Sequence, residues 1–217
     1  AVNVWVADAP KVGGRLLEFR QLWVNGEKAI RAKDTPYPLM NRILSWNKQE
    51  QTCWIPAPKF GDLSKADGLE MLIHQWWAIA NLRIKRIDVQ GDSAKLWFHQ
   101  PESRIQSEHP WPAPWISKET GNSAFYLTNA IQFLNQPGEW FLDTKAKKIY
   151  YIPRPNENLA IAQVIAPALE TLVHIAGTID YPVTNVAFNR VSFQYTSWLR
   201  PSQQGHVPHQ AGLPMLD

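Results

Sequence analysis

Cysteine is almost absent from this sequence, since Cys53 is the one cysteine among 217 residues. A single thiol excludes an intrachain disulfide bond and a metal cluster held by cysteines. Because Cys53 lies between Thr52 and Trp54 in an apolar run, we expect a buried and unreactive side chain.

Long hydrophobic runs and a strong excess of one charge are also missing. No run approaches the roughly 18 apolar residues of a membrane span, so we expect none. The net charge of +3 comes from 22 basic and 19 acidic residues spread along the chain, which argues against a nucleic-acid partner. The densest basic cluster, Arg83, Lys85 and Arg86, is interpreted as a solvated strand face.

Motifs of several enzyme classes are absent as well. The sequence contains no nucleotide-binding loop, no GxSxG elbow and no HExxH metal motif. His206 and His209 form a close pair, but Gly205, Pro208 and Gly212 argue against a helix that would align them on a metal. We therefore expect neither a metal nor a cofactor.

Tryptophan and proline are abundant, with 11 and 17 copies. Tryptophan favours sheets and proline is excluded from helix interiors, so the composition predicts an all-β fold with few helices. Asn25-Gly26 between two apolar runs predicts a hairpin with a type I′ turn. In the run 82–89 the apolar parity slips at Lys85 and Arg86, which predicts a β-bulge.

The middle of the chain contains further expected elements. Residues 100–120, with four prolines, are interpreted as a long stiff loop, and residues 125–134 are the best helix candidate. Residues 139–143 and 148–152 predict a hairpin. The proline-containing connector that follows predicts a domain boundary, with an antiparallel β domain over 1–152 and a second region over 153–217.

Residues 171–198 show short apolar alternations separated by turn residues. Val186 and Phe188, and then Val191 and Phe193, flank the two-residue corner Asn189-Arg190. This spacing predicts the first coils of a right-handed parallel β-helix, whose interior one coil cannot bury alone. An ordinary β-sandwich with short last strands stays open as an alternative.

Glycoside hydrolysis generally needs two carboxyl groups, and five carboxylates lie near the predicted coils. Glu139 is interpreted as a turn or cap residue, Asp143 as a hairpin turn residue and Asp180 as a corner residue. Glu170 is expected at the start of a coil, and Asp217 is the last residue. None of them is a persuasive catalytic acid or base.

Three segments together carry a family resemblance. They are FRQLWVNGEKAIRAK at 19–33, NSAFYLTNAIQFLNQPGEWFLDTKAKKIYYIPRP at 122–155, and residues 166–217. They resemble right-handed parallel β-helix glycan-degrading enzymes, most closely glycoside hydrolase family 141, whose activities include α-L-fucosidase and xylanase. The resemblance implies an antiparallel β domain beside a parallel β-helix.

The resemblance also bears on the site. It implies that the catalytic aspartates lie in later coils, so no catalytic residue is assigned here. It places Trp198, His206, His209 and Gln210 on a loop leaving a coil, where we expect them to bind substrate. An exposed tryptophan can stack on a sugar ring, although Trp198 could equally cover the interior of the coil.

The leading hypothesis is the N-terminal portion of a secreted glycoside hydrolase acting on plant cell-wall or similar complex polysaccharide. Its location would be extracellular or periplasmic. The expected partners are the polysaccharide or oligosaccharide and either the remaining coils or another copy covering the open coil end. A non-catalytic carbohydrate-binding or structural module is the first alternative, and a polysaccharide lyase or epimerase on a β-helix is the second.

Overall fold

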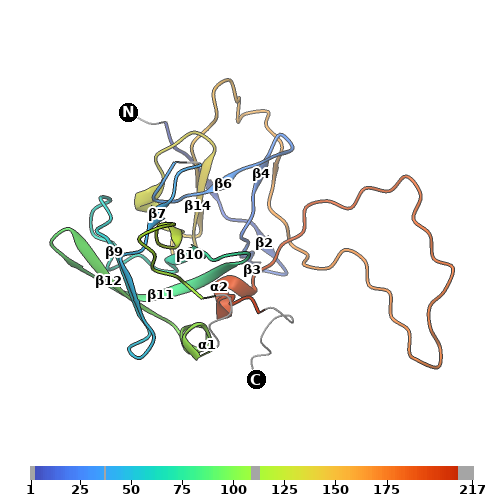
Figure 1. Cartoon of the computed structure of the whole chain (residues 1–217). Coiled ribbons are helices and arrows are strands. Elements are labelled where there is room, and N and C mark those ends of the chain that lie inside the picture. Colours follow the sequence, from blue (N-terminus) through green and yellow to red (C-terminus); the bar gives the residue numbers. More distant parts are fainter. Residues whose placement is uncertain (1–2, 37, 109–112, 210–217) are drawn as a thin grey trace.

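The structure of the chain is a computed structural model that describes residues 3–36, 38–108 and 113–209 (Figure 1). Within these ranges the chain consists mostly of short strands and loops, with two short α-helices and one 3₁₀ helix. The all-β prediction is therefore confirmed. No helix in the described ranges is long and apolar enough to cross a membrane.

The largest sheet has seven antiparallel strands in the order β7-β13-β10-β11-β12-β9-β8. The strands are β7 (Asn41–Arg42), β8 (Ser45–Asn47), β9 (Thr52–Pro56), β10 (Glu70–His74), β11 (Ile79–Gln90), β12 (Ser93–Phe98) and β13 (Ala124–Thr128). Alternation along β10 and β13 directs Met71, Ile73 and Leu127 into the main hydrophobic core, where Cys53 is also buried. This sheet confirms the antiparallel β region.

Smaller sheets surround a second core. The four-stranded sheet has the order β1-β15-β14-β6, in which β14 and β6 run parallel, beside a three-stranded sheet β16-β4-β5 and the pair β2-β3. The strands are β1 (Trp5–Asp8), β2 (Lys11–Val12), β3 (Arg15–Leu16), β4 (Trp23–Val24), β5 (Glu27–Lys28), β6 (Ile30–Arg31), β14 (Glu139–Asp143), β15 (Lys148–Tyr151) and β16 (Val164–Ile165). Phe19 stacks on the buried Trp140 at 5.1 Å between ring centroids.

Two local predictions are confirmed by the backbone. Asn25 and Gly26 join β4 to β5 with φ of 51° and 79°, the positive values that a type I′ turn needs. The pairing of β11 with β12 shifts register between Ile84 and Arg86, where the bulge was expected. The shift keeps both Ile84 and Ile87 buried.

Two other predictions are wrong. Residues 124–128 form strand β13 rather than the start of a helix, because Phe125 and Leu127 share the core face and Asn129 has φ of 68°. Only η1 (Ile131–Phe133) is helical nearby. The proline-rich segment is not all loop, since it contains α1 (Glu102–Glu108), which buries Ile105 and starts directly after Pro101.

Residues 170–197 form an extended arm that leaves the body of the molecule and returns to it (Figure 1). Ser197 donates its backbone N–H to the Leu169 carbonyl at 2.9 Å, and the Leu199 N–H reaches Glu170 Oε1 at 2.6 Å. These bonds close the base of the arm. The arm itself contains no strand. A β-helix strand forms by pairing with a neighbouring coil, and the described part of the chain places no such coil beside the arm. The parallel β-helix and the division at residue 152 stay predictions.

Candidate functional site

The seven-stranded sheet has one polar face near its centre. Glu70 pairs with Thr128, and Leu72 pairs with both Tyr126 and Asn81, so alternation directs these side chains away from the core. The main hydrophobic core lies against the opposite face of the sheet. The polar side is open to other parts of the chain.

The segment that follows the arm covers part of this face. Helix α2 (Arg200–Gln204) contains Pro201, whose carbonyl accepts a hydrogen bond of 3.0 Å from Asn81 Nδ2. Asn81 and His206 exchange two backbone hydrogen bonds of 2.8 Å, so residue 206 extends the edge of β11 locally. The chain on both sides of the arm is thereby attached to the β domain.

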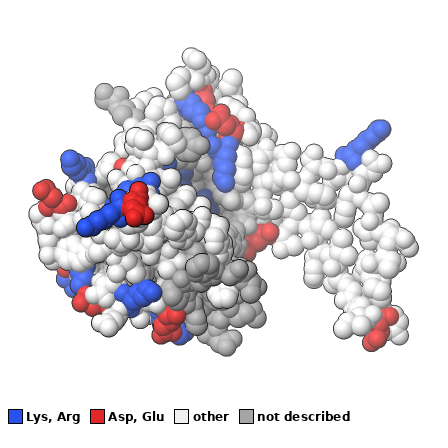
Figure 2. Space-filling view, in the orientation of Figure 1, with Lys and Arg blue, Asp and Glu red and all other residues white. Residues whose placement is uncertain are grey.

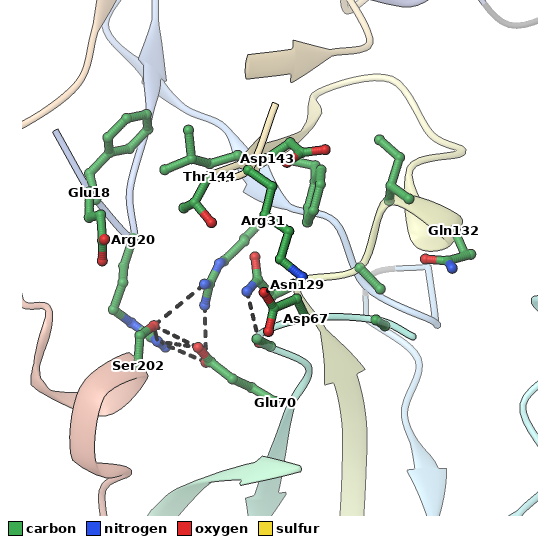
Figure 3. Close-up of a pocket in the computed structure, with 18 of the residues that line it drawn as sticks. Glu18, Arg20, Arg31, Asp67, Glu70, Asn129, Gln132, Asp143, Thr144 and Ser202 are labelled. Carbon is green, nitrogen blue, oxygen red and sulfur yellow. Dashed lines mark hydrogen bonds and ion pairs between the residues drawn. The ribbon is translucent and has the colours of Figure 1, made fainter. Parts of the chain in front are cut away.

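A buried ion cluster lies between α2 and the sheet. Arg20 Nη1 contacts both oxygens of the Glu70 carboxylate at 2.8 Å, Arg31 Nη1 contacts one at 3.0 Å, and the Ser202 hydroxyl donates at 2.6 Å (Figure 3). The Glu70 side chain is 1% exposed. Both oxygens of the Glu70 carboxylate therefore accept hydrogen bonds within the cluster.

The cluster determines the charge state of Glu70. Burial alone would raise its pKa, but the guanidinium groups of Arg31 and Arg20 and the Ser202 hydroxyl outweigh burial and lower the pKa below its ordinary value. Glu70 is therefore ionised at neutral pH. A general acid needs the opposite shift, so Glu70 holds the cluster together rather than donating a proton.

Two pockets adjoin the cluster and share Arg20 and Arg31 in their walls. The first, here the mixed-charge pocket, has a volume of about 340 Å³ and is shown in Figure 3. The second, here the cationic pocket, has a volume of about 590 Å³. Both fall within the range of about 300 to 1,000 Å³ typical of small-ligand sites.

The mixed-charge pocket contains carboxylates that hold the β14–β15 turn. Asp143 accepts a backbone hydrogen bond of 2.7 Å from Ala146, which confirms its interpretation as a hairpin turn residue. Asp67 pairs with Lys145 Nζ at 3.0 Å. These contacts assign the two carboxylates a structural role at the rim.

The cationic pocket brings together two of the four expected substrate-binding residues. Trp198 and His206 line it and meet edge to face, with 4.9 Å between ring centroids. Burial, with help from Arg200 and Arg20, lowers the pKa of His206, so its imidazole is neutral at neutral pH. His209 is exposed and lines neither of these two pockets, and Gln210 lies outside the described residues.

The remaining candidate carboxylates have structural partners. Buried Glu139 accepts backbone hydrogen bonds from Asn135 and Gln136, which agrees with its interpretation as a turn or cap residue. Glu170 closes the base of the arm, and Asp180 lies in an exposed bend of the arm. Asp217 lies outside the described residues.

One further carboxyl group is strongly perturbed. Burial raises the pKa of Asp34 to about 6, although hydrogen bonds from the Leu127 N–H and the Asn41 amide act in the other direction. A raised pKa suits a proton donor, but Asp34 is 7% exposed and lines neither pocket. We assign it to the core of the sheet.

Sequence reasoning missed Arg20, Arg31, Glu70 and Tyr126. The available signal was a charged residue at a regular position inside an apolar strand pattern, as for Glu70 in LEMLIH. The interpretation of the basic cluster as a solvated face holds for exposed Lys85 and Arg86, and it is wrong for one member. Arg83 pairs with buried Glu102 at 2.7 Å, because Glu102 in α1 needs a cationic partner.

Comparison with known proteins identifies relatives of this fold. A family model described as GH141 insertion domain matches residues 2–154. A solved structure titled "Glycoside hydrolase" is 50% identical, with a TM-score of 0.90 over 96% of this chain. The chain spans 36% of that protein. A search of curated proteins finds no match. Because the family model matches well over half of the residues, the chain belongs to the family of GH141 insertion domains.

Proposed function

We propose that this chain is the N-terminal portion of a secreted glycoside hydrolase that acts on plant cell-wall or similar complex polysaccharide, with fucosidase-like or xylanase-like activity. Its family membership and its 50% identity to a glycoside hydrolase support an enzyme parent. The catalytic carboxylates are proposed to lie in coils beyond this chain. The location is proposed to be extracellular or periplasmic.

The geometry of the arm carries the proposal. Asn185, Arg190 and Tyr195 have φ of 58°, 57° and 63°, and they follow one another at intervals of five residues. A left-handed residue between extended stretches turns the chain, so the arm has regularly spaced corners. Between the corners, Phe188 and Phe193 meet edge to face at 5.3 Å. A single coil of a parallel β-helix has this arrangement.

The surface of the arm supports a covering partner. Asp180 and Arg190 are the only residues with formal charges among residues 171–197, and the arm is almost uniformly white in Figure 2. Val186, Phe188 and Val191 are each more than half exposed. Apolar surface of this extent marks an interaction site, and we propose the remaining coils of the same protein, or a second copy, as the cover.

Product chromatography tests the enzyme proposal. The chain and the longer parent protein would each be incubated with fucosylated pectic oligosaccharides and with xylan. We expect the parent to release sugars and the folded chain to release none. Release by the chain would contradict the placement of the carboxylates, and inactivity of the parent on every glycan would contradict the hydrolase itself.

A non-catalytic carbohydrate-binding module is the second candidate. The cationic pocket favours it, because Trp198 and Tyr126 offer aromatic surfaces and His206 and Asn81 offer polar groups within one cavity. Saccharide binding at Trp198, His206, His209 and Gln210 is common to both candidates. Binding by the parent without turnover would favour the module.

A further inference from the structure

The charges around the cationic pocket do not balance. Four cationic side chains line it, Arg20, Lys28, Arg31 and Lys33, and no carboxylate is among its lining residues. Glu70, which lies behind the wall, supplies one negative charge against two guanidinium groups. The cluster therefore carries a net positive charge, and both of its arginines line the cationic pocket.

The two lysines differ in their surroundings. Lys33 is nearly buried, and Glu139 and Asp34 partly offset the lowering of its pKa by burial. Its ammonium lies 5.0 Å from the centroid of the Tyr126 ring. Lys28 is exposed at the rim, and its neighbour Glu27 is engaged by Arg154 at 3.1 Å. Lys28 therefore adds a second positive charge that is accessible from solvent.

Aromatic side chains complete the walls. Tyr126 belongs to strand β13 of the sheet, and Trp198 lies on the segment after the arm, where it contacts His206. Trp198 is 42% exposed. Such surfaces pack against the apolar faces of sugar rings, while cations select for an anionic substituent. The combination suits a sugar that carries a negative charge.

We propose that the cationic pocket binds an acidic saccharide, whose carboxylate or sulfate group is held near Lys28 and the Arg20–Arg31 pair and whose ring packs on Trp198. This inference rests on the proposed function, because it names the substrate class that the glycan-binding face takes. Carboxylate and sulfate share the anionic chemistry, so the experiment separates them.

Titration calorimetry of the 217-residue chain tests the proposal with matched ligands. The probes are trigalacturonate and its neutral methyl ester, and a sulfated galactotriose and its unsulfated form. We expect at least one acidic probe to bind about tenfold more tightly than its neutral counterpart, and high salt to weaken that binding. The preferred acid identifies the anionic group.

Variants locate the site. Lys28→Gln is expected to weaken binding of the acidic probe about two- to fivefold, as for an exposed charge contact, and Trp198→Ala about tenfold. Lys48→Gln is the matched control, because Lys48 is an exposed lysine in the turn between β8 and β9. Circular dichroism establishes that each variant is folded.

The outcomes separate this proposal from the proposed function. Equal binding of acidic and neutral probes would overturn the charge selectivity and leave glycan binding in place. Wild-type affinity in both Lys28→Gln and Trp198→Ala would overturn the location. Binding of none of the four probes would overturn the proposal entirely, whereas the hydrolase assignment is decided by product release from the parent.

Discussion

Glu70 connects three distant parts of the sequence through one carboxylate. Its partners Arg20 and Ser202 lie 50 and 132 positions away in the chain. Arg20 lies in the loop between β3 and β4 and Ser202 lies in helix α2, so the cluster joins both segments to the seven-stranded sheet. The walls of both pockets therefore depend on this one ion cluster.

Replacement of Glu70 by glutamine is expected to lower the free energy of unfolding by about 3 kcal/mol, because two partly buried guanidinium groups lose their counter-ion. Urea denaturation measures the loss. Glu108→Gln is the control, since Glu108 forms an exposed pair with Arg104 one helical turn away and is expected to contribute about 0.5 kcal/mol or less. Equal losses in the two variants would contradict the structural role of Glu70.

Asp34 predicts a specific pH dependence of stability. Its pKa is about 6 in the folded chain against an ordinary value of 3.8, so the folded state retains a proton that the unfolded state has released. The associated stability is fully present below the ordinary pKa and is lost as pH rises through about 6.

Comparison with Asp34→Asn isolates this contribution. Between about pH 4.5 and neutral pH, the wild-type chain is expected to lose on the order of 2 kcal/mol of unfolding free energy relative to the variant. Urea denaturation at both pH values measures the difference. Parallel pH profiles for the two proteins would show that Asp34 titrates normally.

Among the elements, α2 depends on a close contact with α1. A Cβ on Gly205, which ends α2 with φ of 69°, would lie 2.6 Å from Glu102 Cβ and Cγ. Glu102 is buried and holds Arg83, whose guanidinium in turn donates to the Gln203 carbonyl. A side chain at residue 205 would clash with Glu102 and would therefore separate α2 from the sheet.

Gly205→Ala is expected to be at least about 1 kcal/mol more destabilising than Gly91→Ala, because overpacking adds to backbone strain. Gly91 is the matched control, since its φ is 60° and no atom lies within 4 Å of an added Cβ. Thermal unfolding of both variants measures the difference. Similar losses would mean that residue 205 tolerates a side chain.

Elements that are determined by residues adjacent in the sequence could be predicted from the sequence. Asn25-Gly26 specifies its own turn, and the parity slip at Lys85 specifies the bulge, because each signal is local. Strand β13 could not be predicted, because the apolar spacing of FYLTNAIQFL fits both a helix and a strand. Pairing with β10, which is distant in the sequence, makes it a strand. The ion cluster was unpredictable for a similar reason: its members meet only after the sheets and α2 have assembled.

For the whole molecule, the arm is the unusual feature. Many of its apolar side chains stand in solvent. Its contacts with the rest of the described chain include the hydrogen bonds at its base, made by Ser197 and Leu199, and an edge-to-face contact of Tyr195 with Trp23 at 5.2 Å between ring centroids. We expect the isolated chain to self-associate through this surface, as measured by light scattering.

Substitution tests that expectation. Replacing Phe188 and Phe193 with serine is expected to reduce association, whereas Val89→Ser, at an exposed position in β11, serves as a control and leaves it unchanged. A wild-type chain that stays monomeric at high concentration would contradict the need for a cover.

Hydrogen exchange of residues 171–196 tests the proposal that the arm is one coil of a parallel β-helix. In the isolated chain the backbone of the arm forms no strand ladder, so we expect fast exchange there and slow exchange in β10 and β11. In the longer parent protein, pairing with the next coil would make the same amides exchange slowly. Equally fast exchange of residues 171–196 in the parent would contradict the claim.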